Sequence, residues 1–192
     1  MKYSLMEPHF IMKSFQEMNK KEAQQHFDWY ISEISNRINQ LASYYDTNGG
    51  KKEELDFSPE SLKLIWAWFI PLIKTTIKTS EEIETEVKNA PEWLRETIEA
   101  GKEKPSTETL AIAMDIAIYF AEVFTKNFKQ LKWGFIGKPK SLAYVNRPVL
   151  VGFKSMEMDP RAIVYNQLLK SMRGSKDSNL LFNLFEIWKN DI

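Results

Sequence analysis

The residue types most capable of chemistry lie in the apolar segment from Leu110 to Phe124, whose only charged side chains are Asp115 and Glu122. The two acids are seven residues apart, and a helix turns by about 100° per residue, so both carboxylates would lie on one side of a helix. Tyr119, between them, shares that side. Two carboxylates and a tyrosine hydroxyl could bind a hard cation or act in acid and base catalysis. This segment is therefore one candidate binding or catalytic site.

Two structural explanations of the same acids are left open. In the first, the acids mark the exposed stripe of a mostly buried helix, and Glu122 forms an ordinary surface pair with Lys126, four residues later. In the second, Asp115 or Glu122 is buried and accepts hydrogen bonds from the backbone or from Arg147. The sequence does not decide among an active site, a surface stripe and a buried network.

Metal and cofactor chemistry finds little support in the composition. The chain has no cysteine and only two histidines, His9 and His26. Helical two-metal sites usually combine carboxylates with a Glu-x-x-His pair, and neither histidine stands in that relation to the acids. Phosphate-binding loops, dinucleotide fingerprints, nucleophile elbows and HExxH are also missing. We expect no metal ion and no cofactor, and the sequence favours a protein that is not an enzyme.

A second group of candidates lies in the basic segment 126–154. Seven lysines and arginines occur between Glu122 and Glu157 without an acid. Such charges can contact phosphates while aromatic rings stack on bases. The candidate binding residues here are Trp133, Lys138, Lys140 and Arg147. The alternative is a solvated strand face whose charge is balanced by the acidic stretch 81–99.

The charge of the whole chain argues against nucleic acid as the partner. Basic and acidic residues number 26 each, whereas nucleic-acid-binding domains are usually strongly basic. The distribution is nevertheless uneven: residues 1–100 hold 12 basic and 17 acidic side chains, and residues 101–192 hold 14 and 9.

The chain also contains six tryptophans. Most should be core residues, but an exposed one would mark a surface for a partner.

Helical spacing of apolar residues dominates the chain and predicts a multi-helix bundle. The predicted helices cover about residues 9–18, 20–45, 62–78 with a kink at Pro71, a short acidic segment from 79, and then 91–100, 106–128, 159–174 and 177 onward. Short β-rich runs at 131–136, 142–145 and 149–153 predict two or three strands. The fold class is therefore mainly α with a small antiparallel β element between about residues 131 and 153. Because no repeat or linker stands out, we expect a single compact domain over residues 1–192.

Three stretches resemble small bacterial helical proteins that are loosely associated with toxin-immunity or mobile-element neighbourhoods. They are Lys21–Tyr30 followed by Arg37–Leu41; Ser61–Phe69; and Asp115–Phe124 continuing into Lys132–Gly134 and Tyr144–Phe153. These are patterns of aromatic and acidic residues without an assigned chemistry. The resemblance implies a helical bacterial protein and transfers no catalytic residue.

The leading hypothesis is a non-enzymatic protein-binding module, immunity-like or regulatory, in a bacterial cytoplasm. The N-terminus lacks the apolar segment of a signal peptide, and the apolar runs are too short to span a bilayer. One alternative is an enzyme or small-ligand binder centred on Asp115, Tyr119 and Glu122. The other is nucleic-acid or anion binding through the segment 126–154. We expect another protein as the partner, and the sequence does not predict an oligomeric state.

Overall fold

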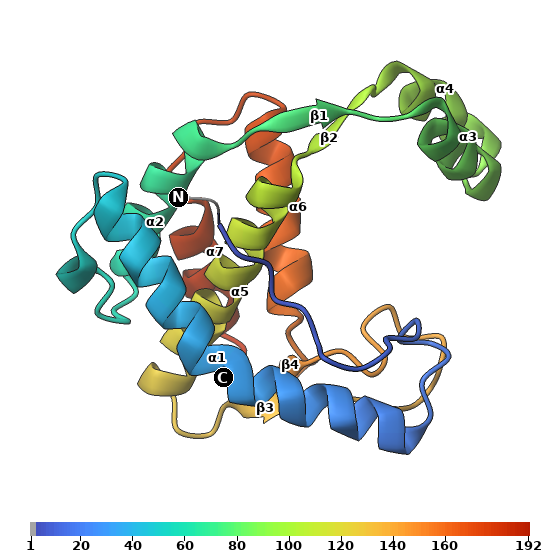
Figure 1. The fold of residues 1–192 in the computed structure, drawn as a ribbon. Coiled ribbons are helices and arrows are strands. Elements are labelled where there is room, and N and C mark those ends of the chain that lie inside the picture. Colours follow the sequence, from blue (N-terminus) through green and yellow to red (C-terminus); the bar gives the residue numbers. More distant parts are fainter. Residues whose placement is uncertain (1–2) are drawn as a thin grey trace.

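Seven α-helices and two short antiparallel sheets make up residues 3–192, the part of the chain that the computed structural model describes (Figure 1). This confirms the predicted class, mainly α with a small β element. The helices are α1 (Lys20–Thr47), α2 (Ser61–Phe69), α3 (Ser80–Asn89), α4 (Glu92–Ala100), α5 (Thr107–Asn127), α6 (Pro160–Met172) and α7 (Leu180–Lys189). The strands are β1 (Thr75–Ile77), β2 (Glu103–Pro105), β3 (Lys132–Gly134) and β4 (Val149–Val151).

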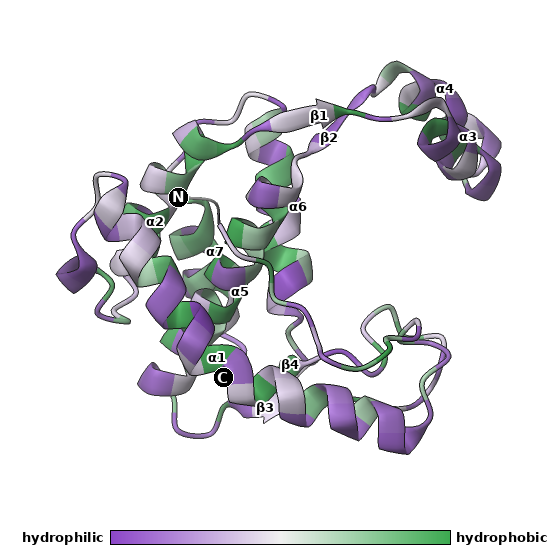
Figure 2. Cartoon of the chain, viewed as in Figure 1, coloured by the Kyte–Doolittle hydropathy of each residue, from purple (hydrophilic) through white to green (hydrophobic). Residues whose placement is uncertain are grey.

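Helix α5 is the centre of the body. It begins where the Ser106 hydroxyl accepts the backbone N–H of Thr109 at 3.2 Å. Thirteen of its 21 residues are buried, because α1 and α6 both pack against it and α2 and α7 complete the core. Figure 2 shows hydrophobic residues gathered in α5 and α7. A helix apolar on nearly all sides is stable only when surrounded in this way.

Residues 75–105, which we call the arm, project from this body (Figure 1). Strand β1 pairs with β2, and α3 and α4 form a helical hairpin beyond them. No residue of α3 or α4 is buried. The hairpin therefore depends on local interactions, including a capping box between Thr79 and Glu82 and ion pairs from Lys78 to Glu86 at 2.7 Å and from Lys104 to Glu82.

The base of the arm is anchored to the start of α5. The Thr109 hydroxyl accepts the backbone N–H of Lys74 at 2.9 Å and donates to the Lys74 carbonyl at 3.0 Å. The backbone N–H of Ser106 also donates to that carbonyl, at 2.9 Å. These bonds hold the two ends of the arm side by side.

The helix predicted over residues 62–78 is wrong beyond Phe69. There the chain makes one 3₁₀ turn, Ile70–Leu72, and then enters β1. Pro71 has no backbone N–H to continue the helix, and the β-branched residues that follow pair with β2 instead. The proline thus ends the helix rather than kinking it, and both strands of the arm escaped prediction.

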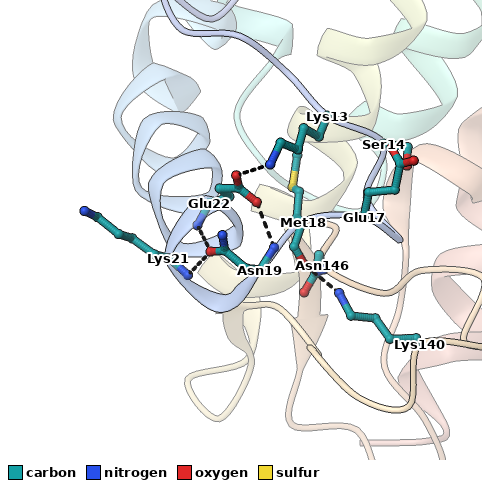
Figure 3. Close-up of polar contacts among 9 residues, drawn as sticks. All are labelled: Lys13, Ser14, Glu17, Met18, Asn19, Lys21, Glu22, Lys140 and Asn146. Carbon is teal, nitrogen blue, oxygen red and sulfur yellow. Dashed lines mark hydrogen bonds and ion pairs between the residues drawn. The ribbon is translucent and has the colours of Figure 1, made fainter.

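The helix predicted over residues 9–18 is also wrong, since these residues form bends and one turn. Helix α1 starts after Asn19, whose side chain accepts the backbone N–H groups of Lys21 and Glu22 while Glu22 accepts that of Asn19 (Figure 3). This capping box requires an extended backbone at Asn19, so no helix runs through it.

The small predicted sheet consists of two strands. Trp133 in β3 lies opposite Leu150 in β4, whereas residues 143–146 form turns and residue 142 belongs to no strand. The intervening loop is tied to the N-terminal segment. Asn146 Nδ2 donates to the Phe15 carbonyl at 2.7 Å. Lys140 Nζ donates to the Met18 carbonyl at 2.5 Å (Figure 3). The predicted run 142–145 therefore forms no third strand, and hydrogen bonds to the N-terminal segment hold this loop instead.

Hydrogen exchange should separate the arm from the body. Because α3 and α4 bury no side chain, we expect their amides to exchange at least about tenfold faster than those of α5. Exchange measured by mass spectrometry or NMR on the full chain tests this, with α5 as the internal reference. Equal protection in the arm and in α5 would show that the arm is covered in solution.

Candidate functional site

Asp115 is a fully buried structural acid. Its side chain is 0% exposed and that of Arg37, on α1, is 6% exposed. Arg37 donates from Nε to Oδ1 and from Nη2 to Oδ2, both at 2.8 Å, in the bidentate arrangement that arginine makes with a carboxylate. The Tyr3 hydroxyl also donates to Oδ2. Burial raises the pKa of Asp115, and the hydrogen bonds from Arg37 and Tyr3 oppose that rise.

The same arginine holds the N-terminal segment against the body. Arg37 Nη2 donates to the Ser4 carbonyl at 2.9 Å, and Gln40 Nε2 donates to the same oxygen at 3.0 Å. Arg37 Nη1 reaches Gln40 Oε1 at 3.2 Å. A buried network is therefore the arrangement adopted by Asp115, but its arginine is Arg37 rather than Arg147.

Tyr119 is also part of the core. Its hydroxyl lies 2.7 Å from the Ser61 hydroxyl and accepts the backbone N–H of Phe57 at 3.0 Å. Its ring stacks on that of Phe57, with 5.0 Å between centroids. Burial raises the pKa of Tyr119, and the bond with Ser61 opposes the rise. The tyrosine fixes the start of α2 against α5.

Glu122 has a third set of neighbours. Its Oε1 accepts the indole N–H of Trp133 at 2.8 Å. It makes no ion pair within residues 3–192, and Lys126 lies over the Phe57 ring instead, at 4.5 Å from the centroid. Asp115, Tyr119 and Glu122 share one side of α5 as their spacing indicated, yet each bonds to different residues and they form no common centre.

Two of the basic side chains in segment 126–154 bond to residues outside it. Lys140 bonds to the Met18 carbonyl, and Arg147 Nη1 pairs with Asp159 at 3.3 Å. Lys138 is exposed, and Trp133 is half-buried. Among residues 3–192 no ion pair joins this segment to the acidic stretch 81–99, whose paired acids bond within the arm.

Metal-ligating groups are scattered in the described part of the chain, where no cluster of three or more histidine and acidic side chains could hold an ion. His26 is buried among aromatic rings including Phe15 and Trp29, and its Nδ1 has no hydrogen-bond partner within residues 3–192. Burial, together with the positive charge of Arg161, lowers the pKa of His26 to about 4.

None of the described helices is both long and apolar enough to cross a bilayer.

Two adjoining cavities run along the exposed face of α6, and together we call them the α6 groove. One, of about 380 Å³, lies between α5 and α6; the other, of about 800 Å³, lies between α6 and the arm. Leu110 and Tyr165 line both cavities, so the two adjoin each other. The groove combines apolar walls with convergent charged groups, as binding sites commonly do.

The lining of the groove is apolar and basic. In the larger cavity the apolar side chains include Leu94, Ile98, Leu110, Tyr165, Leu169 and Met172. Across both cavities six lysines and arginines face only two acids, Glu86 and Glu103. Within residues 3–192, Lys102, Arg161 and Arg173 form no ion pair. The groove is therefore positively charged although the chain is neutral.

Sequence reasoning missed this groove because its walls come from separate segments that only the tertiary fold brings together. One signal was present: Arg161, Ala162, Tyr165 and Asn166 follow helical spacing. That side of α6 carries an arginine and a tyrosine, which is unusual for a side that faces only solvent.

No family model, curated protein or solved structure matches the chain.

Replacing Asp115 should destabilise the protein strongly. The substitution Asp115→Ala leaves the Arg37 guanidinium buried without its counter-charge, so we expect the free energy of unfolding to fall by about 3–5 kcal/mol. Chemical denaturation measures it, with Glu99→Ala on the exposed arm as the control. The double variant Arg37→Met, Asp115→Leu should recover part of the loss. A loss below about 1 kcal/mol for Asp115→Ala would contradict the structural role.

The buried histidine should make stability depend on pH. Because the pKa of His26 is about 4 in the fold against 6.5 in the unfolded chain, the unfolded state binds more protons between these values. The free energy of unfolding should therefore fall as pH decreases from about 6.5 to about 4. The variant His26→Phe keeps an aromatic ring and should show a shallower fall. Identical pH profiles from denaturation would contradict this assignment.

Proposed function

We propose that the protein is a non-enzymatic protein-binding module, immunity-like or regulatory, of a bacterial cytoplasm. The observation that carries the proposal is the α6 groove, an apolar and basic channel between the body and the projecting arm. The resemblance of three sequence stretches to small bacterial helical proteins supports the setting. The α5 residues Asp115, Tyr119 and Glu122 each hydrogen-bond to a different structural partner, and this favours a binding protein over an enzyme.

The arm supplies the surface that a partner would need. Trp93 on α4 is 80% exposed and Ile77 on β1 is 76% exposed. Large apolar side chains exposed at this level mark interaction surfaces when they lie together with an apolar groove. Leu94 and Ile98, also on α4, line the groove itself. A partner segment in the groove would contact both α4 and α6.

The charge of the groove selects the chemistry of that partner. Its excess of lysines and arginines over acids favours a segment that carries acidic residues among apolar ones. Lys102 and Arg173, which lack ion pairs within residues 3–192, are placed to meet carboxylates. We therefore assign the larger cavity of the groove to an acidic, apolar segment of a different protein.

Site-specific photo-crosslinking in cells would test the proposal. A photoreactive residue at Tyr165, which is 43% exposed in the groove, should capture a protein through a peptide rich in acidic and apolar residues. The same residue at Ile187, exposed on α7 at 63%, is the matched control and should capture little. Mass spectrometry then identifies the crosslinked peptide.

A charge substitution completes the test. With the captured partner purified, Tyr165→Glu should weaken its binding at least about tenfold, because it adds a carboxylate to a site for carboxylates. Ile187→Glu should leave the affinity unchanged. Equal capture at both positions, a basic crosslinked peptide, or crosslinks only to a second copy of the chain would contradict the assignment.

A further inference from the structure

The smaller cavity of the α6 groove has the features of a separate ligand site. Its volume is about 380 Å³, within the range of small-molecule pockets. Ala113 and Met114 of α5 form one wall and Ala162 of α6 faces them. Two guanidinium groups, from Arg147 and Arg161, complete the lining. A hydrocarbon surface and two strong donors therefore share one small space.

The two arginines are held near the cavity by a common aromatic ring. The guanidinium carbons of Arg147 and Arg161 each lie 5.5 Å from the centroid of Phe15, a distance at which a cation is attracted to the ring. The Phe15 carbonyl is bound by Asn146 Nδ2, the residue before Arg147. The segment that carries the ring is thus tied to the loop that carries Arg147.

Only one of the two positive charges has a counter-charge. Arg147 pairs with Asp159 at 3.3 Å, and the Asp159 carboxylate also accepts the backbone N–H groups of Arg161 and Ala162 as the N-cap of α6. The Arg161 guanidinium has no ion pair or hydrogen bond within residues 3–192. The cavity therefore carries a net charge of one positive unit.

We propose that this cavity binds a small organic acid, with one carboxylate on the Arg161 guanidinium and an apolar body against Ala113, Met114 and Ala162. A single carboxylate matches the single uncompensated charge, and arginine binds a carboxylate through two parallel hydrogen bonds. Phosphate dianions would leave a negative charge against apolar walls, which is unfavourable. The site does not depend on the protein-binding function, since the ligand is a free small molecule.

Titration of the full chain with phenylacetate tests the proposal. NMR chemical shifts or calorimetry should show saturable binding, with the amides around Ala162 and Met114 shifting. Phenylacetamide, which has the same shape without the charge, should bind at least about tenfold more weakly. Inorganic phosphate, which has the charge without the apolar body, should also bind weakly. A capped Leu-Glu-Leu tripeptide tests whether the carboxylate belongs to a polypeptide instead.

Matched variants locate the binding. Arg161→Gln should weaken phenylacetate binding at least about tenfold, and Arg95→Gln on the arm should not. Ala162→Leu fills the cavity from an exposed helical position and should abolish binding, while Ala143→Leu, in an exposed turn, should not. If Arg161→Gln disturbs folding, Ala162→Leu decides.

Four results would overturn the proposal. They are the absence of saturable phenylacetate binding, equal binding of phenylacetamide, preference for phosphate or the tripeptide, and unchanged affinity in a folded Ala162→Leu variant. A failed crosslinking experiment at Tyr165 would reject the protein partner and leave this result standing, because the two experiments use different ligands.

Discussion

The buried ion pair between Asp115 and Arg37 is the interaction on which the rest of the structure depends. A carboxylate in the middle of the most buried helix would be strongly unfavourable if it were alone, so α1 must present its arginine at that level of α5. Arg37 then also binds the Ser4 carbonyl, and Tyr3 donates to the acid. One pair thus orients α1 on α5 and draws the N-terminal segment across the body.

This arrangement leaves a different side of α5 for α6 and for the groove between them. Arg37 and Tyr3 occupy the side of α5 that carries Asp115, while Ala113 and Met114 face the cavity beside α6. The N-terminal segment that the ion pair fixes at Ser4 continues to Phe15, whose ring lies near the guanidinium groups of Arg147 and Arg161. The network at Asp115 and the proposed carboxylate site are therefore connected through residues 4–15, although they share no side chain.

The arm and the body are stabilised by different interactions. Its helices bury no residue and are held by a capping box, two ion pairs and a two-stranded stem, interactions that are each weak at an exposed surface. Ordering such a segment costs conformational entropy, which no burial of side chains in α3 or α4 offsets. In the proposed function, this exposed segment, including Trp93, provides surface for the partner beside the basic, apolar groove.

Sequence alone determined the elements whose signals are local: the short helix from Thr79, the central helix after Ser106 and the common side of Asp115, Tyr119 and Glu122 all follow from spacing within one or two turns. Helical spacing predicted too much at two places: α2 ends before Pro71 rather than kinking there, and residues 9–18 form no helix. Only the tertiary structure decided that Arg37, 78 residues before Asp115, is its partner, and that α4, α5 and α6 enclose a groove. Pairings across such separations depend on how helices pack, and helical spacing says which side of a helix a residue occupies but not what lies opposite.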